Sequence, residues 1–263
     1  MDAFDKFKQN QREAWAHFAP LEAITTPPAG QLVKFARVKP QDGVLDVGCG
    51  TGVVAVTAAR LGAQVTGLDL TPELLERARE NAAIARVSID FHEGDVENLP
   101  FGDNEFDVVL SQYGHMFAPR PALAIAEMLR VLRPGGTIAF STWPPEMNVG
   151  RQFLLAASYA PPPLEGASPP LQWGDPNIVR ERLAGKVKDV QFNRATMMVP
   201  VLSPYHQRAA AERVGPMRKL VETLSADPAR LDAFRREYDA IVAEYIHDNV
   251  IHQHYLMTRA TKI

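Results

Sequence analysis

The sequence has a single cysteine in 263 residues, which excludes an internal disulfide and any metal site built from several thiolates. It also lacks an excess of charge, because 28 Lys and Arg residues face 31 Asp and Glu residues, for a net charge of −3. No basic run is longer than Arg235-Arg236, so neither nucleic acid nor an acidic membrane surface is indicated as a partner. No stretch approaches a membrane span, and the polar N-terminal segment has no apolar signal core. We expect a soluble cytoplasmic protein, monomeric or homodimeric, whose partner is a small molecule.

The hydrophobic share of 46% is enough for one sizeable core, and the first half of the chain alternates strand-like and helix-like segments. Strands are expected at residues 44–47, 63–68, 88–92, 106–111 and 137–142. Helices are expected at 53–61, from Pro72 onward with Thr71 as N-cap, and at 121–132. This alternation predicts an α/β fold with a parallel sheet, helices on both faces and a ligand site at the carboxyl ends of the strands.

The pattern changes after Trp143, where residues 144–176 are rich in proline and glycine and predict an irregular insertion or lid. Further along the chain we expect a helix at 176–184, a strand at 187–199, helical residues at 204–247 and a last strand at 254–262. Asp227 is expected to cap a second helix within the helical stretch. The chain therefore predicts one domain, 1–263, with an N-terminal helical cover at 1–29, a cofactor-binding core at 30–143 and substrate-lobe insertions at 144–186 and 203–249.

The segment VLDVGCGTG, residues 44–52, places three glycines at every second position directly after an apolar run. A turn of this kind between strand and helix points backbone N–H groups and the helix dipole at a ligand. A dinucleotide fingerprint would need its third glycine at position 53, where Val53 stands, and a Walker loop would need Gly-Lys-Ser/Thr. The loop suits a ligand without a pyrophosphate, although a plain strand-to-helix turn is the alternative.

Two acids follow the next strands. Asp69 closes the second strand about 20 residues after the loop, where a carboxylate can accept both hydroxyls of a ribose. A helix-capping role is the alternative, but Thr71 is available for capping and this favours the ribose. After the third strand, Asp95 can accept the exocyclic amine of an adenine and Val96 can donate its backbone N–H to the ring. A solvated turn acid is the alternative for Asp95.

The segments DVGCGTG, LDLTPELLERAR, EGDVENLPF, FDVVLSQYGHMFAP and LRVLRPGGTIAFSTW occur in this order. Together they closely resemble class I S-adenosylmethionine-dependent methyltransferases of the methyltransferase type 11 subgroup, which is similar to the ubiquinone/menaquinone-biosynthesis enzymes. The resemblance implies a Rossmann-like sheet of seven strands in the order 3-2-1-4-5-7-6, with strand seven antiparallel. It implies S-adenosyl-L-methionine as methyl donor and S-adenosyl-L-homocysteine as product. The implied cofactor residues are Gly48, Cys49, Gly50, Asp69, Leu70, Asp95, Val96 and Ser111, with Ser111 beginning the segment under the sulfonium.

Methyl transfer from a sulfonium is an in-line displacement, whose rate can come from holding two reactants aligned. Aromatic faces can stabilise the sulfonium charge. Trp15 and Phe18, both expected on the N-terminal helix, are the aromatic candidates for the cofactor, with simple helix packing as the alternative. Tyr113, Phe117 and Trp143 are the candidates for contact with the substrate.

His115 is the candidate general base, because it follows the fourth strand and an imidazole suits proton transfer near neutral pH. The alternative is a histidine that lines the cofactor pocket. Metal-dependent methyltransferases place extra carboxylates after strand four, whereas this chain has SQYGHMFAP, so no metal is expected. Cys49 is expected to fill the glycine turn rather than to act as a nucleophile.

Three rival functions predict sequence features that differ from those of methyl transfer to a small molecule. A nicotinamide-dependent oxidoreductase predicts glycine at position 53 and, in the short-chain class, a Tyr-x-x-x-Lys motif, and the sequence has neither. A nucleic-acid methyltransferase would favour a basic surface or an Asn/Asp-Pro-Pro-Tyr/Phe segment, which are also missing from the sequence. A catalytically silent cofactor-binding module is disfavoured by the intact loop and acids, and only a product assay separates it from an enzyme.

Overall fold

A mixed sheet forms the centre of the computed structural model, which describes residues 2–263. Its strands are β1 (Gly43–Val47), β2 (Gln64–Asp69), β3 (Asp90–Glu93), β4 (Phe106–Gln112), β5 (Leu132–Thr142), β6 (Val187–Pro200), β7 (Ile246–His247) and β8 (Val250–Lys262). They are ordered β3-β2-β1-β4-β5-β8-β6, and β8 runs antiparallel to both β5 and β6. The predicted α/β fold and strand order are confirmed, with β8 in the place of the seventh strand.

The strand count is eight rather than seven because the short β7 pairs with the start of β8. The two residues between them, Asp248 and Asn249, have φ angles of +50° and +60°. Two consecutive residues with positive φ form the tight turn whose twist matches a β-hairpin, and Asp and Asn tolerate that conformation well. The extra strand is therefore a local hairpin at the end of β8 and leaves the order of the main sheet unchanged.

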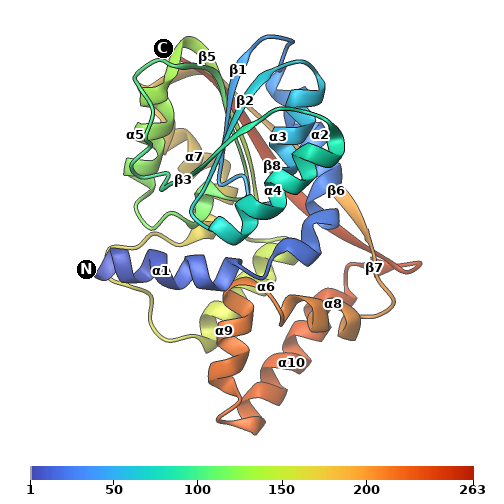
Figure 1. Cartoon of the computed structure of the whole chain (residues 1–263). Coiled ribbons are helices and arrows are strands. Elements are labelled where there is room, and N and C mark those ends of the chain that lie inside the picture. The colour runs from blue at the N-terminus through green and yellow to red at the C-terminus, as the bar shows by residue number, and fades with distance from the viewer. Residues whose placement is uncertain (1) are drawn as a thin grey trace.

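Helices cover both faces of the sheet (Figure 1). On one face lie α2 (Glu22–Ala36), α3 (Val53–Arg60) and α4 (Pro72–Ala85), and on the other lie α5 (Pro121–Val131) and α7 (Pro176–Leu183). In α2 the buried residues Ala29, Leu32, Val33 and Ala36 recur at the three- and four-residue spacing of a single helix face. This apolar face packs on the sheet, so α2 is part of the core rather than of a separate cover.

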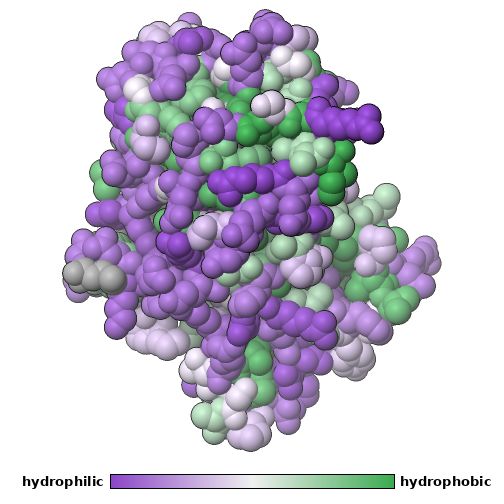
Figure 2. Space-filling view, viewed as in Figure 1, coloured by the Kyte–Doolittle hydropathy of each residue, from purple (hydrophilic) through white to green (hydrophobic). Residues whose placement is uncertain are grey.

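A second group of helices lies beyond the carboxyl ends of the strands, at the bottom of Figure 1. It consists of α6 (Asn148–Tyr159), α8 (Pro204–Ala211), α9 (Gly215–Leu224) and α10 (Pro228–Ala243), and we call it the lobe. The first helix, α1 (Ala3–Trp15), lies between the sheet and the lobe and packs on α9 (Figure 1). The face of the molecule seen in Figure 2 is mostly hydrophilic, with smaller hydrophobic areas between the polar residues.

Several predicted boundaries were wrong. Phe18 follows the end of α1 instead of lying on it, and the boundary placed after residue 29 falls inside α2. Residues 144–176 were expected to be irregular, yet they contain the twelve-residue helix α6. Prolines lie on both sides of α6 and none inside it, so they limit the helix rather than prevent it. The predicted cap at Asp227 is confirmed, since its side chain accepts the N–H of Arg230 at 3.1 Å.

The strand predicted at 137–142 begins earlier, at Leu132, because the Arg-Pro-Gly-Gly segment continues β5 with an irregular register against β4. Among the described helices, none combines the length and the apolar character needed to cross a membrane.

Candidate active site

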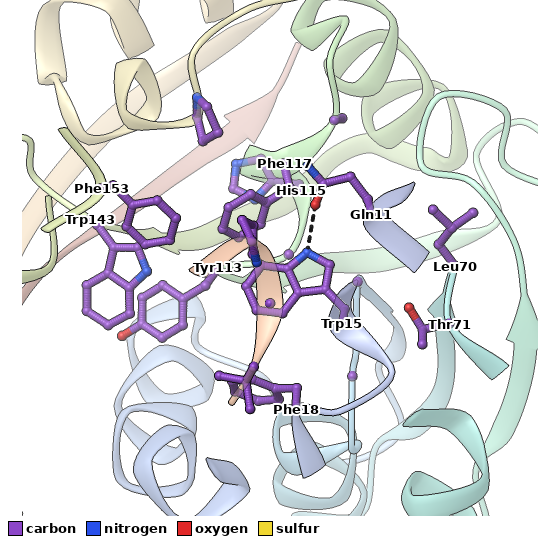
Figure 3. Close-up of a pocket in the computed structure, with 18 of the residues that line it drawn as sticks. Gln11, Trp15, Phe18, Leu70, Thr71, Tyr113, His115, Phe117, Trp143 and Phe153 are labelled. Carbon is purple, nitrogen blue, oxygen red and sulfur yellow. Dashed lines mark hydrogen bonds between the residues drawn. The ribbon is translucent and has the colours of Figure 1, made fainter. Parts of the chain in front are cut away.

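The carboxyl ends of the parallel strands open on a central cavity of about 650 Å³, a volume typical of small-molecule sites. Its first half is lined by α1 and by the segments after β1, β2 and β3, and we call it the cofactor half. Its second half is lined by residues from Gln112 onward, which come from the segments after β4 and β5 and from the lobe, and we call it the acceptor half. Figure 3 shows Leu70 and Thr71 on one side of this space and Trp143 and Phe153 on the other, with Trp15 between them.

The glycine loop after β1 touches the segment after β4 without room for a side chain. A Cβ atom on Gly48 would lie 2.8 Å from the Cα of Gly114, and one on Gly114 would lie 2.6 Å from the carbonyl oxygen of Gly48. Gly48 also has a φ of +64°, which glycine adopts without strain. The glycines therefore allow two backbone segments to meet at the cavity and hold both in place.

Ser111 does not line the cavity, contrary to the expected place under a sulfonium. It is completely buried, and its hydroxyl donates to the Val47 carbonyl at 2.6 Å and accepts the His115 N–H at 3.0 Å. Since both bonds lie within the fold, Ser111 positions the end of β4 against β1. The other sequence-predicted site residues all line the cavity: Trp15, Phe18, Gly48, Cys49, Gly50, Asp69, Leu70, Asp95, Val96, Tyr113, His115, Phe117 and Trp143.

Asp69 ties the loops after β1 and β2 together. One carboxylate oxygen accepts the Gly50 N–H at 2.8 Å and the other accepts the Thr71 N–H at 2.9 Å. Thr71 is the N-cap residue of α4 as predicted, but its side chain makes no capping hydrogen bond, so the carboxylate of Asp69 serves the helix start as well. Burial raises the pKa of Asp69, and the two N–H donors oppose that rise. Asp69 also lines the cavity, where its carboxylate can accept hydrogen bonds from a ligand.

Asp46, in β1, is a cavity residue that was not among the predicted site residues. One carboxylate oxygen accepts the Ala55 N–H at the start of α3, at 3.0 Å, and the other, Oδ1, is buried without a partner among residues 2–263. Burial raises the pKa of Asp46 to about 7, the Ala55 N–H opposes this, and the charge of Asp69 adds to it. An orphaned acceptor facing a cavity points to a ligand donor. The signal in the sequence was a lone acid inside an otherwise apolar strand.

Helix α1 is held over the end of β3 by ion pairs. Lys8 pairs with Asp95 and, at 2.5 Å, with the buried Glu97, and Arg12 pairs with Glu93 at 2.7 Å. Asp95 therefore lines the cavity and anchors α1 at the same time. The two cations of α1 that line the cavity, Lys8 and Arg12, are paired in this way, whereas Asp46 and Asp69 in the cofactor half have no ion-pair partner in the described chain.

Two groups of aromatic side chains line the cavity (Figure 3). Tyr113 stacks on Trp143 with ring centroids 3.9 Å apart and planes 10° from parallel. Trp15 lies against Phe117 at 4.9 Å and against Phe18 at 5.8 Å. Tyr113 also has a φ of +62°, a strained conformation for a bulky residue that is found mainly at functional sites. These five side chains thus pack against one another and also line the cavity.

His115 is 1% exposed and packs against the rings of Phe140 and Trp173 at 4.5 and 4.7 Å. Neither ring nitrogen has a hydrogen-bond partner within residues 2–263. Burial, with a smaller contribution from the charge of Arg182, lowers the pKa of His115 to about 3. An imidazole held neutral so strongly is a weak base. The structure therefore disfavours the predicted role as general base and favours the alternative, a histidine that lines the pocket.

The lobe supplies polar cavity residues that the sequence did not indicate. Tyr238, on α10, donates to the side-chain oxygen of Gln152, on α6, at 2.7 Å. Gln152 in turn donates to the Asn148 side chain at 2.6 Å. Gln152 and Tyr238 are 86 positions apart in the chain, so no local pattern connects them.

Known proteins resemble this chain in two ways. A family model described as a methyltransferase domain matches residues 45–140. The uncharacterised protein Rv1403c of Mycobacterium tuberculosis is 34% identical over 256 residues, which cover 95% of this chain and 93% of the relative. The chain belongs to the class I S-adenosylmethionine-dependent methyltransferases. The predicted family is thereby confirmed.

Two further matches differ in how much of this methyltransferase they cover. Malonyl-[acyl-carrier protein] O-methyltransferase of Pectobacterium atrosepticum is 42% identical over 99 residues, 38% of each chain. The structure of phosphoethanolamine N-methyltransferase 2 of Haemonchus contortus, in complex with phosphomonomethylethanolamine and S-adenosylhomocysteine, is similar at a TM-score of 0.55 and 20% identity, covering 88% of this chain and 51% of that chain. The family model spans the loops after β1, β2 and β3 and ends before the lobe.

Proposed function

We propose that this methyltransferase transfers a methyl group from S-adenosylmethionine to a small-molecule acceptor without a metal ion. The observation that carries the proposal is the pair of carboxylates, Asp46 and Asp69, that face the cofactor half without a cationic partner in the described chain. S-adenosylmethionine is cationic at its sulfonium and its ammonium, so it suits a site with uncompensated negative charge.

The described residues fit this cofactor. The orphaned Oδ1 of Asp46 accepts a hydrogen bond from the ammonium, and the glycine loop admits the aminocarboxypropyl arm close to the backbone. The free acceptor positions of Asp69 take the ribose hydroxyls. Asp95 and the backbone N–H of Val96 take the adenine. Support for these assignments comes from the burial and hydrogen bonds of the residues and from the family match.

When bound, S-adenosylmethionine supplies an electrophilic methyl group: the acceptor's lone pair bonds to it, the S–CH₃ electrons return to sulfur, and any proton on the acceptor atom leaves to water. The chain contributes positioning. Trp15 and Phe117 present aromatic faces at the middle of the cavity, where a positive charge is stabilised. The ion pairs of Lys8 and Arg12 hold α1 across the opening, which limits the entry of water.

Isothermal titration with S-adenosylhomocysteine tests the cofactor. The wild-type chain should bind it and should not bind NAD. Asp69→Ala should bind at least about tenfold more weakly, because a hydrogen bond to a charged group contributes roughly 1.5–3 kcal/mol. Asp232→Ala, which removes an exposed carboxylate of α10 away from the cavity, is the matched control and should bind like wild type. No binding by wild type, or full affinity in Asp69→Ala, would refute the assignment.

Transfer itself is tested by incubating the protein with methyl-labelled S-adenosylmethionine and extracts of small metabolites. Appearance of label in a product that requires the protein supports an enzyme. Cofactor binding without label in any product would instead support the silent cofactor-binding module.

A further inference from the structure

The charged side chains of the central cavity all lie in its cofactor half. They are Lys8, Arg12, Asp46, Asp69 and Asp95. Across the described residues that line the acceptor half, none is Asp, Glu, Lys or Arg. His115 lines this half, and burial keeps its imidazole neutral by lowering its pKa to about 3. A ligand in the acceptor half therefore meets no formal charge from the chain.

The walls of the acceptor half are largely apolar and include planar aromatic rings. Helix α6 turns one face to the cavity at positions spaced three or four residues apart, including Val149, Phe153 and Ala156. On the same side of the cavity as Phe153 in Figure 3, Trp143 and Tyr113 form a stacked pair of planar rings. Aromatic rings pack best on other planar rings, face to face with an offset or edge to face. The shape and chemistry of these walls suit a planar apolar ring system.

The polar groups of this half are neutral, and several of them have hydrogen-bonding capacity to spare. Gln152 donates one amide hydrogen to Asn148 and accepts from Tyr238, so one N–H remains for a ligand. Gln112 is held by its bond to the Thr25 carbonyl at 2.7 Å, and its side-chain oxygen is buried without a partner in the described part of the chain. The Tyr113 hydroxyl and the two ring nitrogens of His115 are likewise without a partner there. Neutral donors and acceptors are thus available to uncharged polar atoms of a ligand.

We propose that the methyl acceptor is an uncharged, largely apolar molecule with a planar ring system and a few neutral oxygen or nitrogen atoms. That this ligand is the methyl acceptor rests on the proposed function, whereas the preference for a neutral ligand rests on the cavity alone. Moving a carboxylate, phosphate or ammonium group into this half removes its hydration and offers no opposite charge, which costs several kcal/mol. Burying a neutral ring gains free energy in proportion to its apolar area, at about 25 cal/mol per Å².

Three naphthalenes test the preference, because they share one ring system and differ in charge near neutral pH. They are neutral 2-naphthol, anionic 2-naphthoate and cationic 2-naphthylmethylammonium. Each is titrated calorimetrically into the full chain saturated with S-adenosylhomocysteine, up to about 1 mM, the weak end of small-molecule affinity. We expect 2-naphthol to bind at least about tenfold more tightly than either ion, which corresponds to roughly 1.4 kcal/mol.

A pair of variants locates the effect in the acceptor half. Ala156→Asp and Ala156→Asn differ only in charge at a cavity position of α6. Relative to the Asn variant, the Asp variant should weaken 2-naphthol and strengthen 2-naphthylmethylammonium, each at least about tenfold. Leu154→Asp adds the same charge to α6 where the side chain is 52% exposed and away from the cavity, and should leave all three affinities unchanged.

The outcomes separate the two proposals. If either ion binds as tightly as 2-naphthol, if 2-naphthol does not bind, or if the two Ala156 variants behave alike, the neutral-acceptor inference is overturned. S-adenosylhomocysteine is also titrated alone, and absence of binding in that titration would refute the proposed function. In that case the naphthalenes are titrated into the chain without S-adenosylhomocysteine, where the same ranking of affinities is expected.

Discussion

Replacing Asp46 by Asn should stabilise the free protein above neutral pH and weaken its affinity for S-adenosylhomocysteine. Asp46 is buried in β1 with an orphaned carboxylate oxygen, and burial raises its pKa from near 3.8 to about 7. Asn has the same shape and retains an oxygen for the Ala55 N–H, but it carries no charge. The variant thus removes a buried charge that costs stability and that we assign to the cofactor.

The direction of this stability change with pH follows from proton binding by Asp46. Between pH 3.8 and about 7 the folded protein holds a proton on Asp46 that the unfolded chain has lost, so the free energy of unfolding falls as pH rises. The fall is complete above pH 7 and amounts to about 4 kcal/mol over the whole range. Between pH 5 and pH 8 the stability advantage of Asp46→Asn over wild type should grow by about 3 kcal/mol.

Urea denaturation at the two pH values, followed by circular dichroism, measures that growth. Asp107→Asn is the matched control: Asp107 accepts the Gly43 N–H and pairs with Arg133, and the N–H bond first and then Arg133 keep its pKa below the usual value. Its difference from wild type should stay flat between pH 5 and pH 8, because that carboxyl is ionised in both states. A flat difference for Asp46→Asn as well, or unchanged affinity for S-adenosylhomocysteine, would refute the assigned role of Asp46.

Two further predictions follow from the geometry. Gly114→Ala should weaken S-adenosylhomocysteine binding and lower the unfolding free energy more than Gly50→Ala does, because its Cβ would lie 2.6 Å from the Gly48 carbonyl oxygen. A Cβ at Gly50 meets nothing within 4 Å, so Gly50→Ala should cost only about 1–2 kcal/mol for its φ of +54°. Equal losses for the two variants in urea denaturation would contradict this. Relative to His115→Gln, wild type should lose up to about 2 kcal/mol of unfolding free energy between pH 6.5 and pH 5, because the unfolded chain protonates His115 there and the folded chain, with a pKa of about 3, does not. The contribution of Asp46 is the same in both proteins and cancels in this difference, and an imidazole signal that titrates near neutral pH in the folded protein would show the reasoning to be wrong.

The cofactor half could be predicted from the sequence because its signals are local. Glycine spacing, an acid at the end of a strand and an acid in a following turn each occupy a few adjacent positions. Ser111 shows the limit of such signals. It has the right place at the end of β4, but its hydroxyl bonds to the neighbouring strand, which only the sheet pairing reveals. Asp46 was missed for the converse reason: a lone acid in an apolar strand marks the position, but only the folded chain shows that one of its oxygens is left without a partner.

The lobe could not be predicted in the same way, because its contacts join distant parts of the chain. The bond from Tyr238 to Gln152 crosses from α10 to α6, and the ring of Trp15 on α1 packs on the backbone of Gly215 at the start of α9, where a Cβ atom would lie 2.9 Å from the ring. Composition misled as well, since the prolines around α6 predicted an irregular segment. Such pairings are decided by packing of whole helices and not by any short motif.

The carboxylates of the cavity and most of its neutral walls come from different parts of the chain. The family match at 45–140 covers the loops that carry Asp46, Asp69 and Asp95, whereas α6 and α8–α10, which supply most of the neutral walls, lie outside it. Tyr113 connects the two parts, because it follows directly from β4, stacks on Trp143 after β5, and lines the same cavity as the lobe residues. A change in the lobe should therefore alter which acceptor fits without disturbing the carboxylates to which we assign the methyl donor. The acceptor preference of this methyltransferase should accordingly be altered by substitutions such as those at Ala156, while its cofactor affinity stays as in wild type.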